Sequence, residues 1–238
     1  MDSEVPTATR PPLPGDAAAT PSERLKRKIE LVSGPFARAC SRVFGGGDLR
    51  RVLPAHFVST HAIIRATVPL MEAGARRARD LVGDDPVAAG VAEYLAQHAE
   101  EERDHDAWLL DDLELMEVDR GDVLRRVPTP TEACLVGSQY YWTFHYHPLA
   151  QLGYIAFMEG HPPSTELVDR LVDESGFPPE AFRTFLAHGE LDPHHRDELD
   201  QAIDSLPLTA EHEALLGLSA MSTAELRARS IEEAVDQA

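Results

Sequence analysis

Apolar residues recur at helical spacing along most of the chain, and this feature limits the possible folds more than any other. Between residues 48 and 82 they stand mostly three or four positions apart, which places them on one face of a helix: Leu49, Val52, Leu53, Phe57, Ile63, Ile64, Val68 and Met71. No Asn-Gly or similar turn joins two alternating apolar runs, and no segment repeats. The sequence therefore predicts an all-α fold.

Clusters of glycine and proline divide this pattern into segments. We expect helices over residues 23–32, 48–82, 87–116, 131–159, 165–174 and 178–206, with two short helical stretches between 209 and 238. Pro54 and Pro69 are expected to kink or interrupt the second helix, because each lacks a backbone donor. Residues 1–21 contain five prolines and no apolar period, so we expect a disordered arm before a single domain over 22–238.

The charge balance excludes several classes of partner. The chain has 22 Lys and Arg against 41 Asp and Glu, a net charge of −19, which argues against binding nucleic-acid phosphates or anionic lipid. No apolar run approaches the length of about 18 residues that a membrane span requires. The N-terminus has no basic and apolar signal pattern, and two cysteines are too few for a disulfide framework. We therefore expect a cytoplasmic protein.

Two segments place histidines and acids on one helix face. In the first, His98, Glu101, Glu102 and His105 stand at i, i+3, i+4 and i+7, and Glu102 with His105 forms the Glu-x-x-His pair of dimetal carboxylate bundles. A solvated charged face is the plainer interpretation of the acids, but the flanking histidines and apolar neighbours count against it. The segment is thus a candidate metal site.

The second segment is more specific. His188, Asp192 and His195 stand at i, i+4 and i+7, and two imidazoles with one carboxylate suit non-haem iron better than structural zinc. Pro193 lies inside the motif and is expected to distort the helix there.

Glu72 and Glu159 stand beside apolar segments, where an unpaired carboxylate costs several kcal/mol. A surface acid near Arg76 is the alternative for Glu72, and an exposed helix end is the alternative for Glu159. Together with the two segments they give seven candidate ligands, about what two ferrous ions need: Glu72, Glu102, His105, Glu159, His188, Asp192 and His195.

The segments HAEEERDHDAWLLDDLE, LGYIAFMEG and HGELDPHH resemble the haem-oxygenase-like diiron oxidases and oxygenases, a family of iron-containing redox enzymes, over roughly residues 50–206. The resemblance implies a haem-oxygenase-like bundle of about seven helices that binds two Fe(II) ions and uses O2 as cosubstrate. It also implies hydroxylation, desaturation, N-oxygenation or oxidative C–C or C–N chemistry on small molecules, often amino acids or fatty acids. An external electron donor fits such chemistry.

At the first iron site, more than one residue of this chain could correspond to a given ligand of the family. Glu72 corresponds to the family's first acid, but His61 is a rival on the same helix face. His98 or Glu101 is an alternative to Glu102, as a ligand or as a residue behind the ligands.

For the substrate pocket, the sequence points to the aromatic segment SQYYWTFHYH and to one arginine. Tyr141, His145 and Tyr154 are candidate substrate contacts, with aromatic core packing as the alternative. Arg65 lies one turn after His61, where a guanidinium fork suits a substrate carboxylate; a surface arginine is the alternative. An aliphatic amino acid in specialised metabolism is the expected substrate, and pairing through helical faces would give a homodimer.

Other functions remain open on the same fold. A thiaminase-like hydrolase would use Cys134 as its thiol, and a cofactor-independent oxidase would need no metal. Haem binding through His56 or His61 is a further alternative, but this acidic chain has few basic residues to pair with the haem propionates. An iron store or sensor would bind iron without catalysis.

Overall fold

The computed structural model describes residues 19–238, so the predicted arm over 1–21 lies almost entirely outside the described residues. The rest confirms the all-α prediction, since no strand occurs between residues 19 and 238. The helices are α1 (Pro21–Val32), α2 (Gly34–Phe44), α3 (Leu49–Ile64), α4 (Thr67–Arg79), α5 (Ala88–Glu101), α6 (His105–Leu115), α7 (Arg120–Arg125), α8 (Pro130–His145), α9 (Ala150–Met158), α10 (Thr165–Ser175), the 3-10 helix η2 (Pro179–Phe182), α11 (Arg183–Ser205) and α12 (Ala210–Gln237).

The helices are more numerous than predicted because the segments 48–82, 87–116 and 131–159 are each interrupted, and because α2 and α7 lie where no helix was predicted. Residues 48–82 divide into α3 and α4 at a turn over residues 65–66, so Pro69 falls in the first turn of α4, where a missing backbone donor costs nothing. Pro54 stays inside α3. Residues 131–159 divide at Tyr146–Leu149, where Pro148 disfavours a helical conformation in the residue before it.

Two helix starts differ from the expected positions. Thr20 caps α1, which begins at Pro21 and not at residue 23, and Thr129 caps α8, which begins at Pro130 and not at residue 131. Both form a capping box with a glutamate three residues later, and both are followed by proline at the first helical position. The predicted pair of short helices after residue 209 is instead the single long helix α12. A continuous buried stripe of small and apolar residues holds it in one piece.

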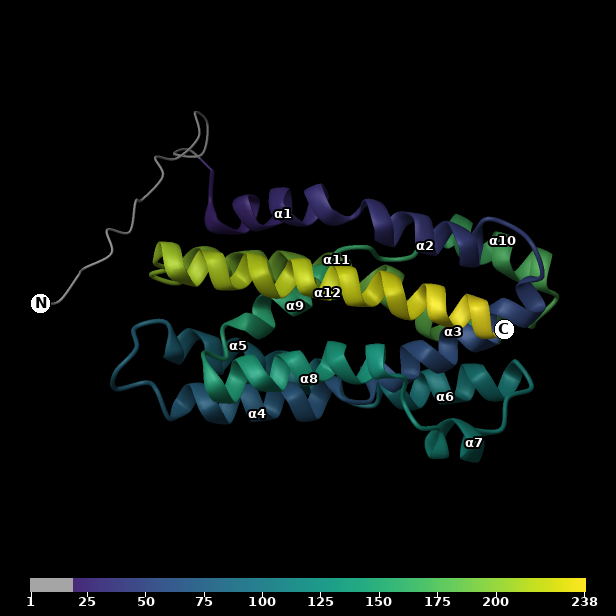
Figure 1. The fold of residues 1–238 in the computed structure, drawn as a ribbon, viewed down its shortest axis with the longest axis horizontal. Coiled ribbons are helices and arrows are strands. Elements are labelled where there is room, and N and C mark those ends of the chain that lie inside the picture. The colour runs from purple at the N-terminus through teal and green to yellow at the C-terminus, as the bar shows by residue number, and fades with distance from the viewer. Residues whose placement is uncertain (1–18) are drawn as a thin grey trace, which may run out of the picture.

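Helix α12 is the central element of the fold. It runs lengthwise through the molecule (yellow in Figure 1) and packs against α9, α2, α1, α8 and α3. Gly153 permits the close crossing of α9 and α12, because a Cβ atom there would collide with the carbonyl oxygen of Leu216. Helices α4 and α5 pack against each other on the other side of the bundle. This arrangement brings the ends of α5 and α9 and the middle of α11 to the interior.

In the part of the chain that the structure describes, none of the helices has the length and apolar character needed to cross a membrane.

Candidate metal centre

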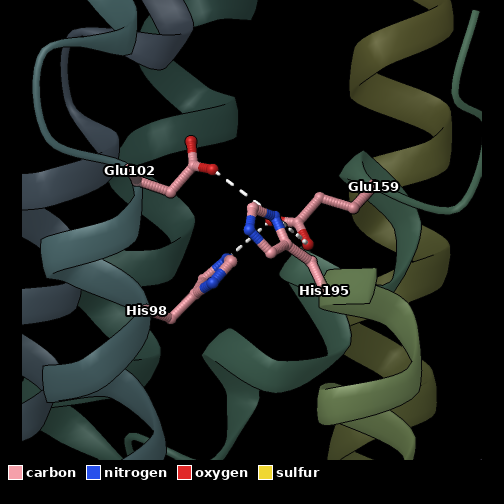
Figure 2. A group of neighbouring side chains, drawn as sticks. All are labelled: His98, Glu102, Glu159 and His195. Atoms are coloured by element: carbon pink, nitrogen blue, oxygen red, sulfur yellow. Dashed lines mark hydrogen bonds and ion pairs between the residues drawn. The ribbon is translucent and has the colours of Figure 1, made fainter. Parts of the chain in front are cut away.

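Three parts of the chain bring four ionisable side chains together in the interior (Figure 2). His98 comes from α5, Glu102 from the turn after it, Glu159 from the end of α9 and His195 from α11. His98 Nε2 lies 2.7 Å from Glu159 Oε1, and His195 Nδ1 lies 3.8 Å from Glu102 Oε1 and 3.9 Å from Glu159 Oε2. None of the four is more than 9% exposed. The four donors lie close enough to hold one metal ion.

A second group shares Glu102 with the first. It joins Glu102 to His105 and His188, with one donor atom from each within 4.8 Å of the others. His105 Nδ1 lies 3.1 Å from Glu102 Oε2, and the rings of His105 and His188 are 5.0 Å apart, centroid to centroid. Oε1 of Glu102 is thus the oxygen near His195, and Oε2 is the oxygen near His105. The carboxylate stands between two neighbouring donor groups, as a bridging ligand does.

Asp192 is brought next to His188 and lies outside the two donor groups. Its Oδ1 lies 2.8 Å from His188 Nδ1, one helical turn away on α11. A carboxylate in this position holds a proton on Nδ1 and leaves Nε2 free to bind a metal. Pro193 lies within α11, which continues to Ser205.

A strained turn places Glu102 and His105. Helix α5 ends at Glu101 and α6 begins at His105, with Asp104 between them at φ +70°. This left-handed conformation costs a residue with a side chain about 1–2 kcal/mol. Such strain often accompanies functional sites. Because of this turn, Glu102 and His105 do not lie on one continuous helix.

The buried donor atoms test whether a metal fits. Oε1 of Glu102, Oε2 of Glu159, and Nδ1 of His105 and of His195 are buried and make no hydrogen bond. A buried polar atom without a partner costs about 1–3 kcal/mol, and metal ions in the two donor groups would satisfy all four. Carboxylate oxygens with imidazole nitrogens are the usual ligands of non-haem iron. The residues present therefore fit iron.

Without a metal, these groups share protons. Burial lowers the pKa of His98, but its hydrogen bonds with Glu159 and Glu101 and the charges of Glu159 and Glu102 together outweigh burial and raise the pKa to about 9. Burial raises the pKa of Glu159. Burial also opposes ionisation of Glu102, but its contact with His105 and the charges of His105, His188 and His98 together lower its pKa. A metal that binds here displaces these protons.

Three other predicted ligand positions lie outside the two groups. Glu72 is on the surface, its side chain 43% exposed, 3.5 Å from Arg103 and 3.8 Å from Arg76. His61 is buried in α3 but belongs to neither donor group. Glu101 borders the first group, with Oε2 3.3 Å from His98 Nδ1 and 4.0 Å from His195 Nε2.

A cavity of about 730 Å³ adjoins the centre. Glu102, Glu159, His188 and Asp192 line it, and most of its remaining wall is apolar. Tyr154, a predicted substrate contact, also lines it and is buried.

The other predicted substrate contacts need correction, because none of them lines the cavity. Tyr141 and His145 are exposed, since α8 buries the opposite face that carries Leu135, Gln139 and Thr143. Arg65 caps the end of α3. Cys134 is exposed, whereas Cys40 does line the cavity.

Arg227 is a charged cavity residue that was not predicted from the sequence. Arg227 is 8% exposed and lines the cavity from α12. Its position on the buried stripe with Ala220, Ala224 and Ile231 was the available signal.

Comparisons with known proteins concern the fold and the family of the chain. A domain of unknown function with a haem oxygenase-like fold from Shewanella denitrificans has a TM-score of 0.75 and 18% identity, over 90% of this chain and 91% of that one. A TenA homolog from Pseudomonas syringae pv. tomato has a TM-score of 0.68 and 10% identity, over 95% of this chain and 98% of that one. At these identities the likeness concerns the fold. A search of curated proteins gives no match. Residues 54–228 match the family described as iron-containing redox enzyme, and the chain belongs to that family.

Proposed function

We propose that the chain is an O2-dependent oxidase or oxygenase that uses two non-haem Fe(II) ions. The observation that carries the proposal is the pair of donor groups that share Glu102 next to a cavity. One mononuclear site would leave part of this buried set without a partner. The family supports an iron-dependent redox reaction in general, and the shared carboxylate supports two ions in particular.

Each side chain has a role in this proposal. Glu102 would contribute to both sites, Glu159 with His195 and His98 would hold one ion, and His105 with His188 would hold the other. When bound, two Fe(II) ions would supply electrons for the activation of O2 and the attack on a C–H or N–H bond. Asp192 orients the ring of His188, and the carboxylates balance the charge of the metal. The apolar wall keeps the substrate in a dry space beside the centre.

The cavity limits the size of the substrate. About 730 Å³ lies within the range of roughly 300–1,000 Å³ that is typical of small-molecule sites. Hydroxylation, desaturation and oxidative C–N or C–C chemistry are all compatible with such a site, and an amino acid substrate stays a prediction.

A thiol enzyme on the same fold is the second candidate, because Cys40 lines the cavity. Burial raises the pKa of Cys40, which disfavours the reactive thiolate. An iron-binding protein without catalysis is the remaining alternative.

Oxygen consumption separates these functions. Protein loaded with Fe(II) under anaerobic conditions is mixed with O2, with and without a panel of amino acids and carboxylic acids, and O2 uptake and products are measured. We expect at least one panel member to be oxidised only by the iron-loaded protein. Turnover by iron-free protein that is lost in Cys40→Ser would support the thiol enzyme. Bound iron with no substrate-dependent O2 uptake would support storage.

A further inference from the structure

Arg227 is a buried cation with no acid beside it. It is 8% exposed, and no Asp or Glu in residues 19–238 forms an ion pair with it within 4.0 Å. Burial lowers the pKa of Arg227 and the charge of Glu132 acts to raise it, but both carboxylate oxygens of Glu132 already accept hydrogen bonds from Arg126 at 2.6 Å. A guanidinium buried without a charge partner costs several kcal/mol, so the fold retains it at a cost in stability.

The hydrogen bonds of Arg227 leave part of its guanidinium free. One terminal nitrogen donates to Thr60 Oγ1 at 2.8 Å, and the other donates to Ser230 Oγ at 3.3 Å. A guanidinium has five N–H donors in a planar fork. Enough donors remain to bind both oxygens of a carboxylate.

The polar side chains of the cavity wall beside Arg227 are uncharged. His56 and Thr60 line it from α3, one helical turn apart, and Cys40 lines it from α2. Burial, together with Arg227, keeps the pKa of His56 well below its usual range, so the ring is neutral. The acids that line the cavity are Glu102, Glu159 and Asp192, all at the metal centre.

Tyr154 lines the same cavity as Arg227 and the glutamates of the metal centre. Burial raises the pKa of Tyr154, a hydrogen bond with Thr67 and the charge of Arg227 lower it, and the charges of Glu159 and Glu102 raise it, so the ring experiences the charges of both Arg227 and the centre. Arg227 itself makes no ion pair with either glutamate. The cavity wall also includes the apolar side chains of Phe44, Ile64, Met71 and Ile155.

We propose that Arg227, with Thr60, binds the carboxylate of the substrate, and that an apolar body extends from there past Tyr154 to the metal centre. The inference rests on the proposed function for the reaction, but the binding site does not depend on it. No acid stands at the Arg227 end to pair with an ammonium group. The substrate class is therefore a monocarboxylate with an apolar body and no α-ammonium group, and a carbon remote from the carboxylate faces the metal centre.

Calorimetric binding to the iron-free full chain tests this site separately from catalysis. The probes are octanoate, its neutral analogue octanamide, and 2-aminooctanoate. We expect octanoate to bind the wild-type protein about tenfold or more tightly than octanamide, since hydrogen bonds to charged groups are worth about 1.5–3 kcal/mol. The amino acid should bind more weakly than octanoate. Equal affinities for octanoate and octanamide would overturn the proposal, and tighter binding of 2-aminooctanoate would overturn the exclusion of amino acids.

Variants assign the effect to Arg227. Arg227→Gln should weaken octanoate binding about tenfold or more and leave octanamide binding unchanged. Arg229→Gln, at an exposed position of the same helix, is the matched control and should bind both as the wild type does. Unchanged octanoate binding in Arg227→Gln would contradict the assignment. If that variant does not fold, the probe comparison on the wild-type protein still decides the result. Failure of iron loading or O2 uptake would leave this binding result unaffected.

Discussion

At the scale of single residues, the position of Glu102 decides the chemistry of the centre. Its two oxygens face different imidazoles, that of His195 and that of His105. Both histidines, Glu102 and His188 were predicted from their spacing on helices, because i, i+4 and i+7 positions share a face. Glu159 was predicted because it is an acid at the end of an apolar segment. The spacing did not decide between His98 and Glu102. The structure places both in one donor group, since the chain turns directly after Glu101.

The positions of Glu72 and Arg227 in the structure were not predicted from the sequence. Glu72 shares a helical stripe with His61 in an unbroken helix, but the turn at residues 65–66 separates their helices, and Glu72 lies on the surface. Pro69 was expected to kink or interrupt this helix, but the exact position of the break, four residues before it, was not predicted. Arg227 went unrecognised because a single arginine in a helix is usually exposed.

Asp112 gives a prediction on pH dependence at this scale. It is 1% exposed, it accepts a hydrogen bond from the Thr184 backbone N–H at 2.9 Å, and burial raises its pKa to about 6. An acid with a raised folded-state pKa favours folding below its unfolded value near 4, and this contribution is lost as the pH rises through 6. Asp112→Asn keeps the shape without the charge. Its stability gain over the wild type should be about 1 kcal/mol larger at pH 8 than at pH 5.

Urea unfolding of the iron-free protein at both pH values measures this difference. The control is Asp111→Asn, because Asp111 is the next residue on α6 and its side chain is 53% exposed beside Arg120. A stability difference between Asp112→Asn and the wild type that does not change with pH would refute the account of this residue.

At the scale of elements, the interruptions between helices build the site. The left-handed residue Asp104 separates α5 from α6, and α9 ends where Glu159 enters the centre. The helical segments themselves were predictable from apolar periodicity, and the split at Pro148 has a local cause. The break at Asp104 was not predictable, because it lies in an amphipathic run without glycine or proline. Helices α6 and α11 pack against each other.

The crossing of α9 and α12 gives a prediction at this scale. A Cβ at Gly153 would meet the carbonyl oxygen of Leu216, so Gly153→Ala should lower the free energy of unfolding by about 1–3 kcal/mol. Gly137→Ala, in α8, is the control because no atom lies within 4 Å of its added Cβ. That variant should gain up to about 1 kcal/mol. Thermal or urea unfolding measures both, and wild-type stability in Gly153→Ala would show that the crossing is not this close.

At the scale of the whole molecule, the bundle is a scaffold around one cavity with two chemically different ends. The acids and imidazoles of α5, α6, α9 and α11 form one end, and Arg227 from α12 with Thr60 from α3 forms the other. The all-α fold and the iron-binding family follow from sequence pattern, and the structure adds the pairing of donor groups. The predicted homodimer and electron donor stay predictions.

The most direct test of a dinuclear centre that shares Glu102 is an anaerobic titration of Fe(II) into the metal-free chain. Calorimetry and metal analysis measure how many ions bind and how tightly. We expect the wild-type protein to bind two Fe(II) ions, because two donor groups share Glu102. Glu102→Gln removes a charge from both groups and should bind at most one ion tightly. The matched control Glu100→Gln, two residues away and exposed beside Arg103, should still bind two. Binding of fewer than two ions by the wild-type protein, or of two by Glu102→Gln with unchanged affinity, would contradict a dinuclear centre bridged by Glu102.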